Sequence, residues 1–144
     1  MRRTVPEGGR RPARQQAVFL LYQRDVTGLS LEELERNAER DGAALDPFAR
    51  ELLEGVAADT ATLDALITDA AEGWTAERIA PLERNIMRVS VHELLDRPDI
   101  PPPVSISEAV GMAKRYCGAE APAFVNGILG KIAADRAEAG EEAL

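Results

Sequence analysis

The side chains most able to do chemistry in this chain are arginines close to its N-terminus. Five arginines and one glutamate stand among the first 14 residues, a local net charge of +4 in a chain whose total is −8. The arginines are Arg2, Arg3, Arg10, Arg11 and Arg14. A guanidinium group is planar, always charged, binds phosphate through two bonds and stacks on bases, which indicates RNA. A solvated arm without a ligand explains the same composition equally well, so both interpretations stay open.

A second candidate lies in the segment FVNG near the C-terminus. Phe124 offers a ring on which a base can stack, and the amide of Asn126 can bind a base edge. Gly127 and Gly130 allow a close approach of another backbone. The alternative is structural: Phe124 is a core residue, and the glycines let two helices pack closely.

Residues suited to catalysis are too few and too scattered to form a site. His92 and Glu93 are adjacent, which places them about 100° apart on a helix, and the HExxH zinc motif needs a second histidine. The lone Cys117 has no disulfide partner and lies on an apolar stripe. The chain contains neither a P-loop nor a GxGxxG motif. We therefore predict no enzyme activity, no cofactor and no metal site.

Composition predicts one small helical domain. The chain has 144 residues, of which 45% are hydrophobic and only 4% aromatic, so its core must consist of aliphatic side chains that favour helices. It shows no apolar run long enough to cross a membrane and no signal peptide, and we expect a cytoplasmic protein. Residues 25–72 hold thirteen acids and three arginines, so the positive charge is concentrated toward the chain ends.

Apolar periodicity and capping residues predict where the helices lie. The expected organisation is a flexible basic arm over residues 1–9, a helical domain over 10–138 and an acidic tail over 139–144 too polar to pack. The four prolines of RPDIPPPV predict a stiff connector without helix, followed by a helix starting at Ser105 with a Glu108 capping box. Helices are predicted from Pro12 to Thr27, after Ser30, from Asp46 to Gly73, from Pro81 to Leu95, from Ser105 to Cys117, and through Phe124 to Ala133.

Four segments together resemble the NusB family of bacterial transcription antitermination factors. They are RRPARQQAVFLLY at 10–22, ERNIMRVSVHELL at 83–95, IPPPVSISEAVGMAKRY at 100–116 and FVNGILGKI at 124–132. The resemblance implies an all-α compact bundle of about seven helices in two packed subdomains. It also implies binding of boxA RNA together with NusE, a small-subunit ribosomal protein, within the RNA polymerase antitermination complex that supports ribosomal RNA transcription.

The resemblance carries specific roles over to matching positions of this chain. The RNA-binding residues that it implies are Arg10, Arg11, Arg14, Lys114, Phe124 and Asn126. The NusE-facing residues that it implies are Tyr22, Glu83 and Arg88.

This chain departs from the family pattern at Ser107, where Asn is common, and at Ala121–Ala123, where polar residues are common. These positions predict weaker RNA contacts just before Phe124. Two other functions remain open. One is an accessory module like the NusB-like domain of RNA cytosine methyltransferases, and the other is a helical module that binds only proteins. Self-association into a homodimer could mask the RNA site.

Overall fold

Every regular element of the protein is a helix in the computed structural model, which describes residues 9–143. The elements are α1 (Arg10–Thr27), α2 (Leu31–Arg40), α3 (Pro47–Ala70), the 3-10 helix η2 (Ala76–Arg78), α4 (Pro81–Asp96), α5 (Pro102–Tyr116) and α6 (Ala121–Ala143). The all-α prediction is confirmed. The described residues form six α-helices and one 3-10 helix, against the predicted count of about seven. None of these helices is long and apolar enough to span a bilayer.

Local sequence signals determine most helix ends. Gly28 ends α1 with φ of +77°, a left-handed conformation that only glycine adopts without strain, and its N–H donates to the Arg24 carbonyl. Ser30 and Glu33 form a capping box at the start of α2. The Asp46 carboxylate accepts the N–H of Phe48 at 2.7 Å and so begins α3. The predicted arm over residues 1–9 lies outside the described residues except for Gly9.

The longest helix, α3, is kinked rather than straight. Asp59 has φ of −126° and ψ of 17°, outside the helical range. The hydroxyl of the next residue, Thr60, donates to the carbonyl of Val56 at 2.7 Å, a bond that commonly bends helices. The two halves of α3 therefore point in different directions and can pack against different neighbours.

The predicted connector before α5 is wrong in its second half. α5 begins at Pro102, not at Ser105, because the first turn of a helix needs no backbone N–H donors and therefore accepts proline. Ser105 makes no cap; its hydroxyl lies 2.9 Å from that of buried Ser90. Glu108 does not take part in a capping box either; its carboxylate accepts hydrogen bonds from Arg11 of α1.

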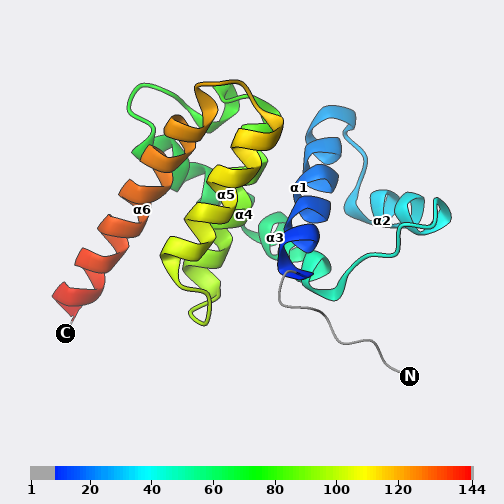
Figure 1. The fold of residues 1–144 in the computed structure, drawn as a ribbon, viewed down its shortest axis with the longest axis horizontal. Helices are drawn as coiled ribbons and strands as arrows, with labels where there is room; N and C mark the ends of the chain where they lie inside the picture. Colours follow the sequence, from blue (N-terminus) through cyan, green and yellow to red (C-terminus); the bar gives the residue numbers. More distant parts are fainter. Residues whose placement is uncertain (1–8, 144) are drawn as a thin grey trace.

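Most of the acidic tail predicted over 139–144 is helical and forms the end of α6. α6 runs to Ala143 and extends past the other helices toward the C-terminus (Figure 1). Side chains from Ala134 to Gly140 are exposed.

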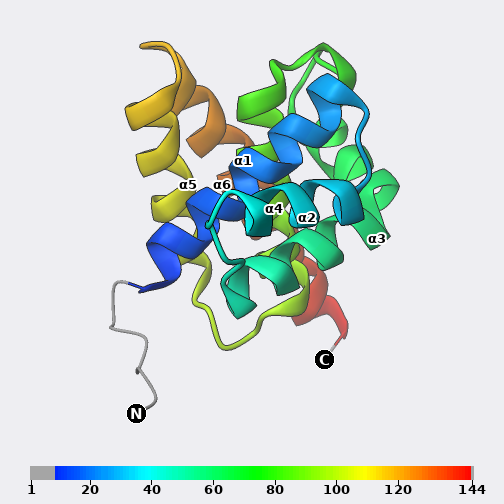
Figure 2. The ribbon, with the colours of Figure 1, turned by 90° about the vertical axis from the view of Figure 1, so that its right-hand side faces the viewer.

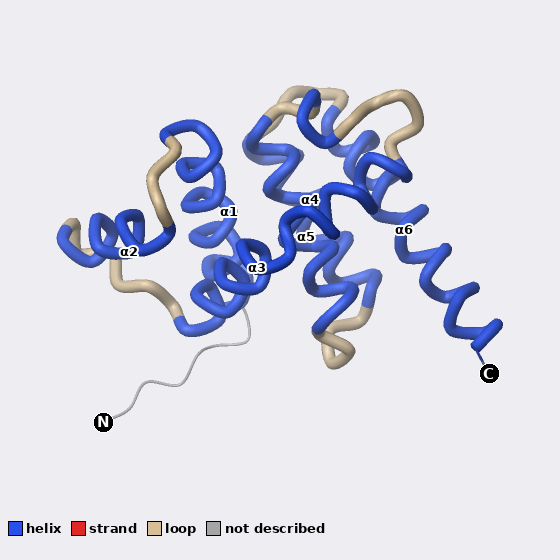
Figure 3. The backbone as a smooth tube through the Cα atoms, turned by 180° about the vertical axis from the view of Figure 1, so that it is seen from behind, coloured by secondary structure: helices blue, strands red, loops and turns tan. Residues whose placement is uncertain are grey.

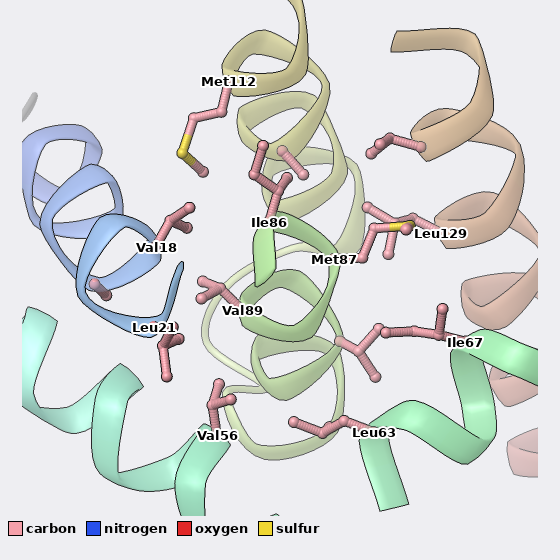
Figure 4. Close-up of a cluster of buried hydrophobic side chains, with 14 of the residues drawn as sticks. Val18, Leu21, Val56, Leu63, Ile67, Ile86, Met87, Val89, Met112 and Leu129 are labelled. Carbon is pink, nitrogen blue, oxygen red and sulfur yellow. The ribbon is translucent and has the colours of Figure 1, made fainter. Parts of the chain in front are cut away.

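α4 is the central helix, as its wide apolar face predicts. It packs against α1, α3, α5 and α6, while α2 packs beside α1 (Figure 2). α1 and α2 lie at one end of the molecule and α6 at the other (Figure 1). One continuous aliphatic cluster joins these helices (Figure 4). Its largest members include Leu21, Leu52, Leu63, Ile67, Ile86, Met87 and Leu129.

The loops decide which surfaces are neighbours. The segment between α3 and α4 and the loop between α5 and α6 meet at one end of the helices, and the α4–α5 connector lies at the opposite end (Figure 3). α5 therefore spans the distance between the start of α1 and the start of α6.

Candidate nucleic-acid interface

The first turn of α1 presents two arginines to solvent. The Arg11 guanidinium donates to both carboxylate oxygens of Glu108, at 3.0 and 2.9 Å, while 63% of its side chain stays exposed. This hydrogen bond lowers the pKa of Glu108 and raises that of Arg11. Arg10 lies 3.6 Å from Asp99 and its guanidinium stands 5.0 Å from the centre of the Phe48 ring. Both arginines keep donors available for an external anion.

Arg14 differs from its neighbours because it is buried. It is 5% exposed, and its Nε and Nη2 donate to the two carboxylate oxygens of Glu93 at 2.7 and 3.2 Å. Glu93, on α4, is itself 1% exposed. Arg14 therefore joins α1 to α4 beneath the surface and does not stand beside Arg10 and Arg11 as a surface cation.

The exposed side of α5 connects these arginines to α6. A hollow of about 260 Å³ between α1 and α5 is lined by Arg11, Ser107 and Arg115. A wider hollow between α5 and α6 is lined by Ser107 and Asn126. Lys114, also exposed, stands two turns beyond Ser107 on the same side of the helix. The fold thus brings Arg11, Lys114 and Asn126 to one face, and adds Arg115.

Sequence reasoning did not single out Arg115. The signal that could have found it is the basic pair that it forms with Lys114 in the last turn of α5. Two adjacent helical residues point about 100° apart, so one can face α1 while the other faces α6.

The FVNG segment does not form a single contact site. Phe124 and Asn126 are two positions apart on α6, so they point to nearly opposite sides of the helix. Buried Val125 lies between them. Phe124 is half-buried and faces Trp74, with ring centres 6.3 Å apart in an edge-to-face arrangement. Asn126 instead faces the hollow beside α5.

The three residues expected to face NusE also fall into different environments. Tyr22 is 36% exposed on α1, and Val26, one helical turn further on, is also exposed. Tyr116 reaches α1 through an edge-to-face contact with Phe19 at 4.9 Å between ring centres. These four side chains form an aromatic and apolar strip along α1 and the end of α5.

Arg88 and Glu83 lie away from that strip. Arg88 is 6% exposed, and it donates twice to Asp64 at 2.7 Å and once to Asp25 at 2.8 Å. It therefore joins α4 to α3 and α1 from inside the protein. Glu83 is half-buried and lines the same pocket as Phe124.

His92 and Cys117 have structural surroundings. Nδ1 of buried His92 lies 3.2 Å from Asp96, and its ring packs against Gly55 of α3. Cys117 packs against the core, and burial followed by the charge of Glu83 raises the pKa of its thiol. Among residues 9–143, no cluster of three or more His, Cys, Asp or Glu side chains could hold a metal ion.

The fold and these surfaces define a small all-helical binding protein whose basic and apolar faces are suited to macromolecules. Residues 11–134 match the model of the NusB family, and the chain belongs to that family. This membership confirms the family predicted from the sequence, and it agrees with the prediction that the chain is not an enzyme.

Similar proteins support the assignment along most of the chain. The transcription antitermination protein NusB of Rubrobacter xylanophilus is 41% identical over 120 residues, which cover 83% of this chain and 86% of that protein. A structure of T. maritima NusB matches with a TM-score of 0.77 at 33% identity, covering 86% of this chain and 89% of that one. A crystal structure of the antitermination factors NusB and NusE in complex with dsRNA matches with a TM-score of 0.77 at 26% identity. The match covers 88% of this chain and 96% of that chain.

Proposed function

We propose that this protein is a transcription antitermination factor that binds boxA-type RNA together with NusE and supports ribosomal RNA transcription. The observation that carries the proposal is its similarity in sequence and fold to NusB proteins, one of them crystallised with NusE and dsRNA. The protein would act without catalysis, by joining the transcript to a ribosomal protein and to RNA polymerase. A factor that works on nascent bacterial RNA belongs in the cytoplasm.

The RNA-binding surface that we propose runs from the start of α1 across α5 to α6. Arg10 and Arg11 supply guanidinium groups for phosphates, and Lys114 with Arg115 supplies a second group of cations at the other end of α5. Asn126 supplies an amide for a base edge. Arg14 is left out, because moving it to the surface would leave Glu93 buried and unpaired.

Asp99 and Glu108 are part of this surface in a supporting role. Glu108 accepts two hydrogen bonds from the guanidinium of Arg11, and Asp99, which is hydrogen-bonded to Arg97, lies 3.6 Å from the guanidinium of Arg10. A guanidinium has five N–H donors, so donors remain for a phosphate. The ion pairs reduce the rotamer freedom that RNA binding would otherwise have to remove.

The NusE surface that we propose is the strip of exposed Tyr22, Val26 and Tyr116 together with half-buried Phe19, since exposed aromatic and apolar side chains are typical of protein interfaces. Arg88 supports this surface from beneath through Asp25 at the end of α1. We also infer that α1, α2 and the first half of α3 form one subdomain and α4–α6 the other, joined by the kinked α3.

Binding to a fluorescently labelled boxA-type RNA, measured by anisotropy with and without NusE from 50 to 200 mM salt, tests the proposal. Affinity should fall steeply with salt, and Arg11→Ala should reduce the slope of log affinity against log salt by about 0.7–0.9. The matched control is Arg36→Ala, which removes an exposed arginine of α2 far from this surface. A salt-independent affinity, or equal effects of the two variants, would refute the RNA surface.

The protein-binding alternative has a separate readout in the same titration. If the protein binds NusE but binds no RNA, either without NusE or in its presence, the result would support the module that recognises only proteins. Light scattering at the concentrations used would reveal a homodimer, whose masking effect should weaken as the protein is diluted.

A further inference from the structure

We infer that Arg97 is a positioning residue for RNA binding, because it holds the carboxylate of Asp99 and so keeps the neighbouring Arg10 available to a phosphate. The inference rests on the proposed RNA-binding function and adds to it a residue that does not itself touch RNA. Arg97 directly follows α4, and Asp99 lies in the connector to α5. Asp99 and Arg10 both line a hollow of about 260 Å³ at the start of α1.

A tight turn brings Arg97 and Asp99 together. The N–H of Ile100 donates to the Arg97 carbonyl at 3.0 Å, which closes a four-residue turn with Pro98 at its second position, where proline is favoured. The N–H of Arg97 donates to the carbonyl of Glu93 at 2.9 Å and ties the turn to the end of α4. The backbone that carries both side chains is therefore fixed by bonds within the chain.

Arg97 occupies both oxygens of the Asp99 carboxylate. Its Nε donates to Oδ1 at 2.9 Å and its Nη2 to Oδ2 at 2.8 Å, while its Nη1 donates to Glu51 of α3. Two parallel bonds are the strong form of an arginine–carboxylate pair, and they lower the pKa of Asp99 to about 2. Nη2 of Arg10 stays 3.6 Å from Oδ2, beyond hydrogen-bond distance. Asp99 therefore attracts Arg10 without binding it.

The ring of Phe48, in the first turn of α3, supports both arginines. The guanidinium carbon of Arg10 lies 5.0 Å from the ring centre, and that of Arg97 lies 5.2 Å from it. A guanidinium within about 6 Å of an aromatic ring is attracted to the ring. The start of α1, the start of α3 and the α4–α5 connector thus meet at one corner of the molecule (Figure 2).

Loss of Arg97 would change the partner of Asp99. A carboxylate without its two hydrogen bonds is free to close on Arg10, whose side chain is 46% exposed and only 3.6 Å away. The new pair would occupy one edge of the Arg10 guanidinium and balance its charge, so a phosphate would gain less by binding there. Arg97 thus prevents a carboxylate of the protein from competing with RNA for Arg10.

Direct contact of Arg97 with a phosphate is the competing interpretation. The side chain of Arg97 is only 20% exposed, and its Nε, Nη1 and Nη2 already donate to carboxylates. Two carboxylates, Glu51 and Asp99, balance its single charge, which leaves little net attraction for a phosphate. These contacts favour the positioning role.

A double-mutant cycle read by RNA anisotropy tests the positioning role, with the salt concentration varied from about 50 to 200 mM. Arg97→Gln should reduce the slope of log affinity against log salt by about 0.7–0.9, as Arg10→Ala does when it removes one phosphate contact. Adding Asp99→Asn to Arg97→Gln should restore the slope, and this gain should exceed the gain from Asp99→Asn in the wild type. In the Arg10→Ala background, Arg97→Gln should cause no further loss.

The cycle separates positioning from a general effect of charge. If Arg97 acted only through its charge at a distance, the effects of Arg97→Gln and Asp99→Asn would add, and Arg97→Gln would act equally with and without Arg10. Arg97→Lys provides a second variant that keeps the charge but lacks the planar fork that binds both oxygens. Its slope should fall in the same direction by a smaller amount and should recover with Asp99→Asn.

The outcomes also separate this inference from the proposed function. If RNA binds with a steep salt slope that neither Arg97 variant changes, or that Asp99→Asn does not restore, the positioning role is refuted and the function stands. An equal further loss in the Arg10→Ala background would show that Arg97 contacts RNA, and the inference is then wrong. If the wild-type protein binds no RNA with or without NusE, both are refuted. Circular dichroism of each variant checks that losses of affinity do not arise from unfolding.

Discussion

The buried ion pair between Arg14 and Glu93 gives the sharpest test of the structure against the sequence pattern. Arg14 stands in the arginine-rich start of α1, where the family resemblance implies RNA contact, yet it is 5% exposed and doubly bonded to Glu93. Arg14→Met keeps a similar length of side chain but removes every donor. It leaves the Glu93 carboxylate, which is 1% exposed, buried without the counter-ion that holds it.

The expected loss of stability is large. Removing one partner of a buried pair costs about 3–5 kcal/mol, because the remaining charge is left without compensation. A domain of this size has a total stability of roughly 5–15 kcal/mol, so the variant loses a substantial part of it. At about 3 °C per kcal/mol, the melting temperature should fall by roughly 10–15 °C. Urea unfolding followed by circular dichroism measures the change in the free energy of unfolding.

The double variant Arg14→Met with Glu93→Leu is the matched control. It removes both charges and fills the space with apolar atoms, so most of the lost stability should return. Its RNA affinity and salt slope should stay close to those of the wild type, because Arg14 is only 5% exposed and Glu93 only 1%, and the two are bound to each other. The reasoning fails if Arg14→Met melts like the wild type and lowers the salt slope by about 0.7–0.9, as a surface phosphate contact would.

Three further predictions follow from single contacts. Gly55→Ala should destabilise the protein by about 1–3 kcal/mol in urea unfolding, because its Cβ would lie 2.2 Å from Cε1 of His92. The Arg97 hydrogen bond lowers the pKa of Asp99 to about 2, so the stabilisation from Asp99 should be complete above its ordinary pKa near 4 and vanish as pH falls through about 2, as carboxyl NMR titration can follow. Burial raises the pKa of Cys117, so iodoacetamide should alkylate it more slowly in the native protein than in urea.

The first two of these predictions have a control variant, and the third has an outcome that would contradict it. Gly140→Ala in α6 meets no atom within 4 Å and should not destabilise the protein, so an equal loss at both glycines would contradict the clash. Arg97→Gln should return the Asp99 pKa toward its ordinary value, and an unchanged titration would exclude Arg97 as the cause. Equal alkylation rates of Cys117 in native and unfolded chains would show that burial does not protect it.

The helix N-termini show which features capping and proline patterns predict and which they do not. Asp46 caps its helix as predicted, and Ser30 caps the helix that was predicted to follow it, because a cap depends on residues only two or three positions away. The start of α5 was misplaced because proline is read as a helix breaker, while the first turn accepts it. The capping box expected at Glu108 gave way to a tertiary ion pair with Arg11, which no local pattern contains.

The sequence indicated correctly that arginine is the side chain to look for, but it did not show which arginines are exposed. Arg14 and Arg88 have the same side chain as Arg11, but carboxylates from other helices, Glu93 and Asp64, hold them inside the protein. The direction in which a helical side chain points relative to the core depends on which helices pack against it. That direction separates a phosphate-binding arginine from a structural one.

By itself, the sequence determined the helical class, most helix ends and the family, because periodicity, capping and ordered motifs are local properties of the chain. The tertiary structure alone decided which arginines are exposed, that Phe124 and Asn126 face different hollows, and that Trp74 meets Phe124 in a pocket. These facts depend on contacts between residues up to 97 positions apart, as in the pair Arg11 and Glu108. Such contacts arise only when helices with compatible apolar faces pack into one core.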